Sequence, residues 1–433
     1  MTTPNLNRRT LLCGAAGLAL GAHGPAGAAE APGTPAAGAA GSAAGANAVD
    51  WDALARHYDV ATEFVNLENA YLGVMARPVL EAYRHNIDVL NRGSSHYLRT
   101  RFDSVERDAI RARLAAHTGV APGELALTRN ACESLQNLIG NYRLLRPGDV
   151  LMMGDLDYDV VQDAMAATAR RGGHQLVTVQ TPEPATRQGV IDAYEQALRQ
   201  HPRTRLLLLT HVNNRTGLVT PVAEIVRMAK GRGVDVVVDI AQSWGQLDYA
   251  IPDLGADFVG GNLHKWIGAP PCSGFLAIRA SRLQDIAPHA GNTLYPDGDV
   301  RARVHAGTMD VPAVMTIPAA LDFHGRVKLA DRAARLRQLR DRWVHQVREL
   351  PGVQVLTPED PTTYGALTSF RIRDKTRYED NVALARRLAD DYGIFTVARK
   401  GPAGGACIRV TPSWFTRNEE LDRLAAAIKA LAA

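Results

Sequence analysis

Short apolar runs alternate with amphipathic segments between residues 124 and 279. Several of the runs are apolar at consecutive positions, and they lie at 124–128, 149–154, 175–180, 205–212, 234–240, 256–261 and 274–279. A strand that is buried on both faces needs this pattern, because both sets of alternating side chains meet a core. Between the earlier runs, apolar residues at helical spacing predict helices at 131–144, 158–172, 190–200 and 221–232. The alternation predicts an α/β fold, with a mostly parallel seven-stranded sheet covered by helices on both faces.

The pattern changes after Pro312. A long charged helix is predicted at 323–349, and it is followed by two further helices and four short strands at 378–391, 417–431, 352–356, 366–372, 394–398 and 406–411. This mixture predicts a smaller α+β domain at the C-terminus. We therefore expect a large domain at 76–322 and a small domain at 323–433, with residues 49–75 packing on the small domain.

The first 28 residues have the order of features that is typical of an export signal. Arg8 and Arg9 precede an apolar run at 11–20, and Ala26-Gly27-Ala28 follows as a small-residue cleavage site. The adjacent arginines favour the twin-arginine route, so we expect a periplasmic protein that is cleaved near Ala28. The alternative is a disordered start. The apolar run is too short to span a bilayer, so no membrane anchor is expected. Residues 29–48 are mostly Ala, Gly, Pro and Ser, which predicts a flexible linker.

Composition, charge and cysteine content argue against only a few classes of partner and site. The chain has 433 residues, of which 46% are hydrophobic and 22% charged, and its formal net charge is +4. Both signs are interspersed without a basic block, which argues against a nucleic-acid partner. After the signal, the cysteines are Cys132, Cys272 and Cys407. This odd and widely spaced set predicts neither a disulfide framework nor a zinc site, and no metal is expected.

Polar residues gather where the predicted strands end. Ligands of open α/β sheets bind at the carboxyl ends of the strands. The residues expected there are Ala131, Cys132, Tyr158, Asn214, Asp239, Gln242, Asn262, His264 and Lys265. A single aspartate at a strand end is more often a cap, and a single lysine is more often a surface group. Together they suit pyridoxal 5′-phosphate, which needs an amine for its aldehyde, a carboxylate for its ring nitrogen and a helix N-terminus for its phosphate.

Four segments give the sequence a family resemblance. They are VVVDIAQSWG at 236–245, GNLHKWIGAP at 261–270, HAGTMDVPAV at 305–314 and CIRVTPSWFTRNEELDRL at 407–424. With them, the chain resembles fold-type I pyridoxal phosphate enzymes of the class V aminotransferase family, nearest the isopenicillin N epimerase-like branch. The resemblance covers nearly all of residues 60–430.

The resemblance implies a role for each residue. Lys265 would be the Schiff-base lysine, and Asp239 would pair with the ring nitrogen. Tyr158 would stack on the ring. The phenolic oxygen would bind Gln242 and Asn214, and the phosphate would bind Ala131, Cys132, Asn262 and His264. Thr308 would reach the phosphate in the partner subunit, which makes a homodimer the functional unit. Arg409 would hold the substrate α-carboxylate, with further substrate contacts from Asn69 and Tyr71.

Some positions keep a second interpretation. Asn69 and Tyr71 could instead be packing residues. Arg399 and Lys400 could contact an acidic side chain, but a solvated loop is the favoured interpretation. Cys132 stands where many relatives have threonine, and Cys272 stands where glycine is common.

The sequence leaves the reaction open. Cysteine desulfurases carry a nucleophilic cysteine on a mobile loop and usually stack a histidine on the ring, whereas Cys407 lies on a predicted strand and Tyr158 takes the stacking position. Epimerase, aminotransferase and lyase activities share the same residues around the cofactor, and a non-catalytic cofactor-binding protein is a further alternative.

An export signal on a class V fold resembles the periplasmic enzyme of pyoverdine maturation. That resemblance implies oxidative decarboxylation of a glutamyl group of a peptide siderophore to succinamide. The rest of such a conjugate would leave the site past Tyr71, His96 and Tyr97.

Overall fold

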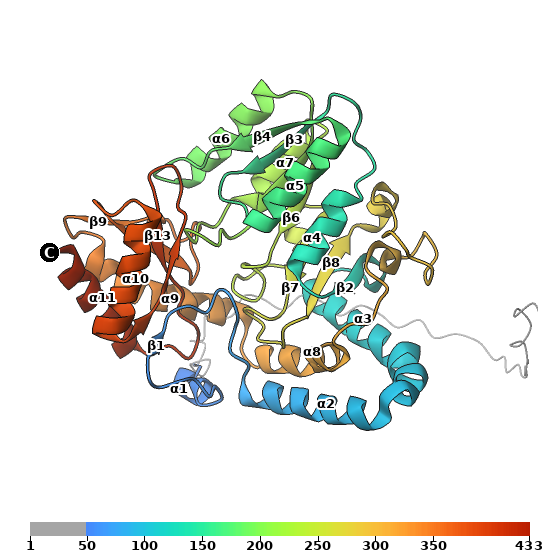
Figure 1. Ribbon diagram of the computed structural model, residues 1–433, viewed down its shortest axis with the longest axis horizontal. Helices are drawn as coiled ribbons and strands as arrows, with labels where there is room; N and C mark the ends of the chain where they lie inside the picture. Colours follow the sequence, from blue (N-terminus) through green and yellow to red (C-terminus); the bar gives the residue numbers. More distant parts are fainter. Residues whose placement is uncertain (1–48) are drawn as a thin grey trace, which may run out of the picture. The chain divides into compact units, whose positions relative to one another are not determined.

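The large sheet forms from the seven predicted strands. The computed structural model describes residues 49–433, so the predicted signal and linker lie outside the described residues. The sheet order is β2-β8-β7-β6-β5-β3-β4 (Figure 1). The bounds are β2 Leu125–Thr128, β3 Val150–Gly154, β4 Gln175–Val179, β5 Thr204–Thr210, β6 Asp235–Asp239, β7 Phe258–Asn262 and β8 Gly274–Ile278. Only β8 runs antiparallel to its neighbours, which confirms the predicted mostly parallel sheet.

Helices cover both faces of this sheet, because alternate strand residues feed two separate cores. Leu206 and Leu208 of β5 join the core beneath α4 (Ala131–Gly140) and α5 (Asp159–Gly172). Leu207 and Leu209 point the other way, into the core of the opposite face. The helices on that face are α3 (Arg107–Thr118), α6 (Arg187–Gln200), α7 (Val222–Lys230) and α8 (Val311–His324). The central strand β5 is therefore apolar on both sides.

The C-terminal part builds a second, antiparallel sheet of order β12-β13-β10-β9. Its strands are β9 Val353–Val355, β10 Thr368–Ile372, β12 Val397–Arg399 and β13 Cys407–Val410. A third core joins the sheet to α9 (Leu329–Val347), α10 (Tyr378–Tyr392) and α11 (Asn418–Ala432) (Figure 1). This confirms the smaller α+β unit.

The predicted helix at 323–349 is wrong at its start. The chain instead forms α8, capped by the Asp310 side chain at its N-terminus, and then breaks at 325–328 before α9 begins. Glycine at position 325 and the extended backbone of Lys328 separate the two helices. The predicted boundary between the domains falls inside α8 and stays a prediction.

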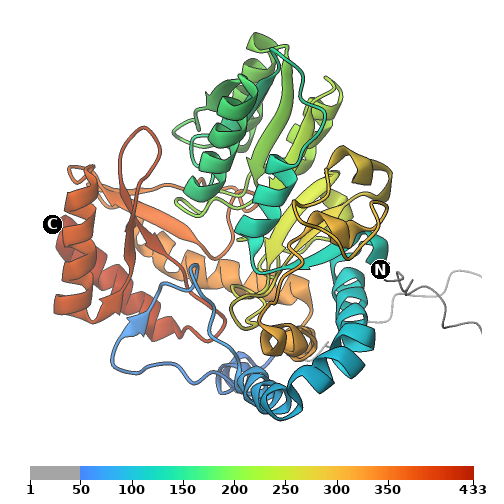
Figure 2. The ribbon, with the colours of Figure 1, turned by 45° about the vertical axis from the view of Figure 1, so that its right-hand side comes forward.

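The N-terminal segment reaches the small sheet's side of the molecule. After α1 (Trp51–Ala55), β1 (Val65–Asn66) pairs in parallel with β11 (Ile394–Phe395) (Figure 2). Residues 77–118 then form α2 (Arg77–Tyr97), the π-helical η1 (Leu98–Glu106) and α3. Short 3₁₀ turns are η2 Pro122–Glu124, η3 Ile251–Leu254, η4 Ala280–Asp285 and η5 Val300–Arg303. Among the described residues, no helix is both long enough and apolar enough to cross a membrane.

Candidate active site

A cavity of about 500 Å³ lies where the parallel strands end. The last residues of β5, β6 and β7, which are Thr210, Asp239 and Asn262, all line it. Other walls come from residues 70–72, the start of α4, the loop between β7 and β8, and the two arginines Arg399 and Arg409 of the small sheet. Strands and helices that are far apart in sequence thus converge on one enclosed space, as expected for an open α/β sheet.

Lys265 lies in the loop that joins β7 to β8 and lines the cavity. The loop is held by backbone bonds from Leu263 to Ser273 and from Ala269 to Leu263, each 3.0 Å long. Burial lowers the pKa of Lys265 to about 8, although the nearby Asp239 carboxylate opposes this shift. At pH 7 about a tenth of the Lys265 side chains are therefore neutral amines, and the neutral amine is the form that attacks a carbonyl.

Asp239 ends β6 at the floor of the cavity, with 5% of the residue exposed. Burial raises the pKa of its carboxyl group, while the Ala241 N–H, at 2.7 Å, and Lys265 act against the rise. One carboxylate oxygen is therefore fixed by the backbone. The group can hold a proton that is shared with a basic ring nitrogen.

The N-terminus of α4 opens on the same cavity. Asn130 caps the helix by accepting a 2.9 Å bond from the Glu133 N–H, and Ala131 and Cys132 are its first two residues. Their N–H groups have no partner within the helix and carry the positive end of its dipole. Burial raises the pKa of the Cys132 thiol, which keeps it neutral beside this end.

Five buried polar atoms of residues that line the cavity have no hydrogen-bond partner among the described residues. They are Oγ1 of Thr210, Oδ1 of Asn214, Oδ1 of Asn262, Nδ1 of His264 and Nε of Arg399. Burial also lowers the pKa of His264 to about 4, so this imidazole is neutral. Buried polar atoms normally have partners, and an unpaired set that converges on one space indicates a bound polar group.

Gln242 and Tyr158 also line the cavity. The Gln242 amide donates to the Ala70 carbonyl at 2.8 Å and accepts from Trp266 Nε1 at 3.1 Å. Trp266 is itself buried, and its bond fixes the orientation of this amide. Tyr158 is half-buried at the N-cap of α5, where burial raises the pKa of its phenol. Tyr158 therefore lies at the cavity wall, and its stacking on the ring stays a prediction.

Arg409 lines the cavity from β13, but its guanidinium is already paired. Nε donates to Oε2 of Glu68 at 3.1 Å, Nη2 donates to Oε1 of the same carboxylate, and Nη1 donates to the Asn214 carbonyl at 2.7 Å. The Arg409 and Glu68 side chains are only 4% and 7% exposed. The sequence offered a signal for Glu68, because it is the single charge within VNLENAYLG, but the pairing was not predicted.

The remaining predicted residues take different positions. Asn69 is buried outside the cavity lining and donates to the Thr411 carbonyl at 2.8 Å, which is the packing alternative. Tyr71 lines the cavity with 77% of its surface exposed. Thr308 is exposed and lies outside this cavity, and its role in a partner subunit stays a prediction. His96 and Tyr97 do not line the cavity, and the Tyr97 hydroxyl instead contacts Glu106.

Two expectations about the small sheet have opposite outcomes. The solvated-loop interpretation is wrong for Arg399, which is a half-buried residue of β12 and lines the cavity, whereas Lys400 is exposed. Cys407 is fully buried in β13, with its Sγ 3.6 Å from the Arg215 carbonyl. It is therefore fixed in a strand, as the sequence indicated. The described residues contain no His, Cys, Asp and Glu cluster that could hold a metal ion.

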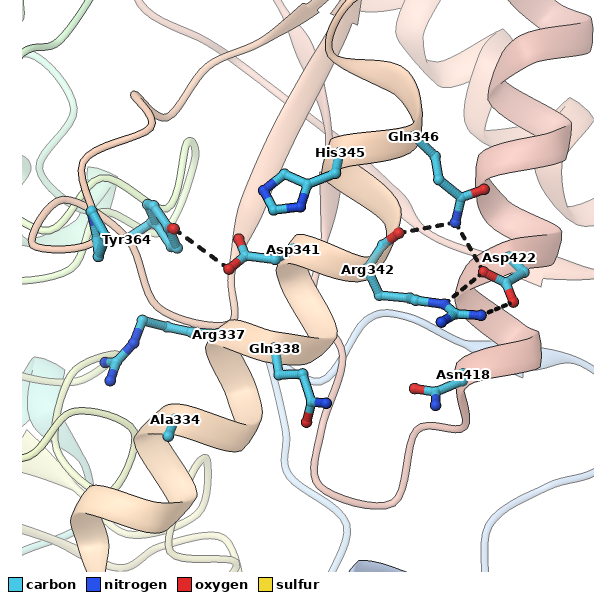
Figure 3. A pocket seen from close by; sticks show the side chains of 11 residues that line it. Ala334, Arg337, Gln338, Asp341, Arg342, His345, Gln346, Tyr364, Asn418 and Asp422 are labelled. Carbon is cyan, nitrogen blue, oxygen red and sulfur yellow. Dashed lines mark hydrogen bonds and ion pairs between the residues drawn. The ribbon is translucent and has the colours of Figure 1, made fainter.

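A larger groove lies on the surface between α9 and α11 (Figure 3). It measures about 1040 Å³, and two pairs of its polar side chains contact each other. Arg342 binds Asp422 through two nitrogens at 2.8 and 2.6 Å, and Tyr364 approaches Asp341 at 3.5 Å (Figure 3). None of the residues that line the Lys265 cavity takes part.

The residues of the Lys265 cavity fit pyridoxal phosphate. An amine of lowered pKa, a buried carboxylate and a helix N-terminus lie at its edge. The side-chain amides of Asn214 and Asn262 carry N–H groups that can donate, and the neutral His264 imidazole carries one N–H, as the acceptor oxygens of a phosphate and a phenolate require.

Known proteins place the chain in a family. The sequence model described as "Aminotransferase class-V" matches residues 75–418. The isopenicillin N epimerase of Streptomyces clavuligerus is 32% identical over 337 residues, which cover 74% of this chain and 83% of that protein. A cysteine desulfurase of Pectobacterium atrosepticum is 26% identical, with 81% and 87% covered.

The fold has close structural neighbours as well. A cysteine desulfurase from Thermococcus onnurineus superimposes with a TM-score of 0.75 at 20% identity, over 88% of this chain and 97% of that one. The predicted family, fold type and cofactor are confirmed. The chain belongs to the class V aminotransferase family and is a pyridoxal phosphate-dependent enzyme.

Proposed function

We propose that this enzyme acts outside the cytosol on the terminal glutamyl group of a peptide siderophore or a similar conjugate, and converts it to a succinamide. The observation that carries the proposal is that a twin-arginine-type start and a cavity that fits the cofactor occur in the same chain. Free amino acids are abundant in the cytosol, so an exported enzyme of this family gains most from a substrate that matures outside. The twin-arginine route carries folded proteins, which suits an enzyme that takes up its cofactor before export.

Each cavity residue has a definite task in this reaction. When bound, pyridoxal phosphate supplies an electron sink for the pair released at the substrate Cα. Ala131, Cys132, Asn262 and His264 would hold its phosphate, and Asp239 would keep a proton at its ring nitrogen. Asn214 and Gln242 would bind its phenolic oxygen, and Tyr158 would stack on its ring.

Lys265 would hold the cofactor through its amine and would move protons at the reacting atoms. In its neutral form this amine has the nucleophilicity that an aldehyde-bearing cofactor requires. Closing the site around a buried lysine excludes water from these steps.

The overall reaction is balanced with dioxygen as oxidant. The glutamyl group, linked through its side-chain carbonyl, loses its α-carboxylate as carbon dioxide, and its Cα becomes an amide carbonyl that keeps the α-nitrogen. One dioxygen is consumed for each substrate, and one carbon dioxide and one water are released. The four electrons lost by the substrate reduce the dioxygen.

The test is incubation of the purified enzyme, in air, with an acyl-γ-linked glutamate and, separately, with free glutamate. We expect the succinamide by mass spectrometry from the conjugate, with one equivalent of oxygen consumed, and no product from the Lys265→Ala variant. Turnover of free amino acids alone would contradict the proposal.

Epimerisation is the second candidate, because the 32% identical relative is an isopenicillin N epimerase. It predicts that the conjugate exchanges its Cα hydrogen with solvent deuterium without loss of carbon dioxide. An aminotransferase would instead form a keto acid. Desulfurase activity has less support, since the β12–β13 connection at 400–406, KGPAGGA, carries no cysteine.

The homodimer belongs to the proposal as well. Thr308 is exposed, and the family resemblance assigns it to the phosphate in the other subunit. We expect sedimentation to give a dimer, and Thr308→Ala to weaken cofactor binding. A fully active monomer would contradict this assignment.

A further inference from the structure

Two arginines reach the cavity from one face of the small sheet. In the antiparallel pair of β12 and β13, Val397 lies opposite Arg409 and Arg399 lies opposite Cys407. Residues two apart on a strand share a face, so Arg399 and Arg409 are diagonal neighbours, within reach of each other's long side chains. Both line the cavity that contains Lys265.

The two guanidinium groups differ in their partners. A carboxylate binds arginine best through two parallel bonds, and Glu68 already takes the Nε–Nη2 edge of Arg409 in this way. The Asn214 carbonyl takes a third N–H. Arg399 forms none of the ion pairs found among residues 49–433, and its buried Nε has no hydrogen-bond partner there.

The Glu68 carboxylate is held in place by the backbone around it. The Glu68 N–H donates to the Asn66 side chain at 3.0 Å, and the Thr411 N–H donates to the Leu67 carbonyl at 2.8 Å. Glu68 itself pairs with Thr411 as an isolated bridge. Since the segment is fixed on both sides of Glu68, a substrate carboxylate has to displace a well-anchored competitor to reach the same edge of Arg409.

The charges around Arg399 also indicate that its guanidinium is the unpaired cation. The charged groups nearest Arg399 are Arg409, Glu68, Arg215 and Asp159. Glu68 neutralises Arg409, and Asp159 neutralises Arg215. The positive charge left over is that of Arg399. A half-buried and unpaired guanidinium at the wall of a ligand cavity is a site for an anion.

We propose that Arg399 is a specificity-determining residue that binds the substrate's carboxylate, and that Glu68 assigns it this role by occupying the carboxylate-binding edge of Arg409. Arg409 then contributes only the end of its guanidinium. This inference rests on the proposed function in one respect, which is that the substrate carries a carboxylate. It does not depend on which reaction the enzyme catalyses.

The test measures binding of a ligand that cannot react. Glutarate carries carboxylates but no amine, so its dissociation constant on the cofactor-loaded enzyme can be measured by calorimetry. We expect Arg399→Gln to raise this constant at least about tenfold, because a charge-assisted hydrogen bond is lost. Glutaramide, the neutral diamide, should bind equally weakly to both proteins. Lys400→Gln is the matched control, since it removes the same charge from the adjacent exposed position, and its effect should stay under about twofold.

Equal glutarate affinities for Arg399→Gln and Lys400→Gln would overturn the proposal. The reason given for the role is tested separately with Glu68→Gln, which frees the edge of Arg409. In the Glu68→Gln protein, Arg399→Gln should reduce glutarate affinity by a smaller factor than it does in the parent enzyme. An equal reduction in both proteins would overturn the role proposed for Glu68. Arg399→Lys, which keeps the charge, should recover part of the affinity and shows whether a loss reflects misfolding. If glutarate binding follows these expectations while the glutamyl conjugate is not converted, the inference stands and the proposed function fails.

Discussion

The Lys265 cavity and the groove between α9 and α11 differ in a way that volume does not capture. The groove has about twice the volume, about 1040 Å³ against about 500 Å³. Its Arg342 is paired with Asp422, and both of these side chains are well exposed. The cavity is smaller but contains unpaired buried atoms of Asn214, Asn262 and His264. The polar groups that a fold leaves unpaired thus indicate binding better than the space that it leaves open.

The largest expected effect tests whether the cavity is the reaction centre. Lys265→Ala removes the amine that carries the cofactor, so turnover should fall at least about a thousandfold. The visible absorption band of the lysine-bound cofactor should disappear as well. Lys400→Ala, at an exposed position, should keep both. An unchanged spectrum in the Lys265 variant would break the comparison, because the cavity would then not hold the cofactor.

A smaller effect is expected from the buried carboxylate. Asp239→Asn keeps the shape of the side chain but removes its charge, so the ring nitrogen loses the group that holds its proton. We expect kcat to fall by about 10²–10³-fold, in the range found when a buried electrostatic contact to a transition state is removed. Cofactor content, measured by absorbance, should remain. Full turnover in this variant would show that the carboxylate has no part in the chemistry.

A pH titration sharpens the same comparison. Burial lowers the pKa of Lys265 to about 8, so the neutral amine increases as pH rises through 8 and not through the ordinary range near 10. Cofactor-free enzyme should therefore capture pyridoxal phosphate faster with increasing pH, with a midpoint near 8. The Asp239 charge raises this pKa, and Asp239→Asn should shift the midpoint to lower pH. A midpoint near 10 would mean that the lysine is hydrated.

The smallest effect is expected in the groove. Arg342 and Asp422 are 47% and 40% exposed, and exposed ion pairs contribute at most about 1 kcal/mol to the free energy of unfolding. Arg342→Gln should lower stability by no more than this in a denaturant titration. Turnover and glutarate binding should change less than about twofold. A loss of activity comparable to that of Asp239→Asn would give the groove a function.

Strand positions were predictable because they depend on local pattern. The runs at 205–212 and 234–240 contain β5 and β6, and Asp239 closes its strand where the sequence placed it. Topology then brings strand ends together, so the gathering of Asp239, Asn262 and Lys265 followed from the order of the strands alone.

Contacts between distant segments were not predictable in the same way. The pairing of Glu68 with Arg409 joins residues 341 positions apart, and no local pattern indicates it. Arg399 looked like a loop residue because it is followed by KGPAGG, yet β12 extends as far as this arginine. Asn69 follows Glu68 directly in the sequence, but its side-chain amide donates a hydrogen bond to the Thr411 carbonyl and does not line the cavity.

The link between Glu68 and Arg409 also sets the order in which the protein can be completed. Ribosomes add about 5–20 residues per second, so Glu68 is synthesised roughly 20 to 70 s before the arginine that it binds, 341 residues later. The bond from Asn69 to Thr411 closes over the same interval. Although Lys265 and the sheet around it are made earlier, the wall that carries Arg399 and Arg409 arrives with the last part of the chain. Cofactor capture in a finished pocket is therefore a post-translational event, and a nascent chain that lacks its final 30 residues has no complete site to offer.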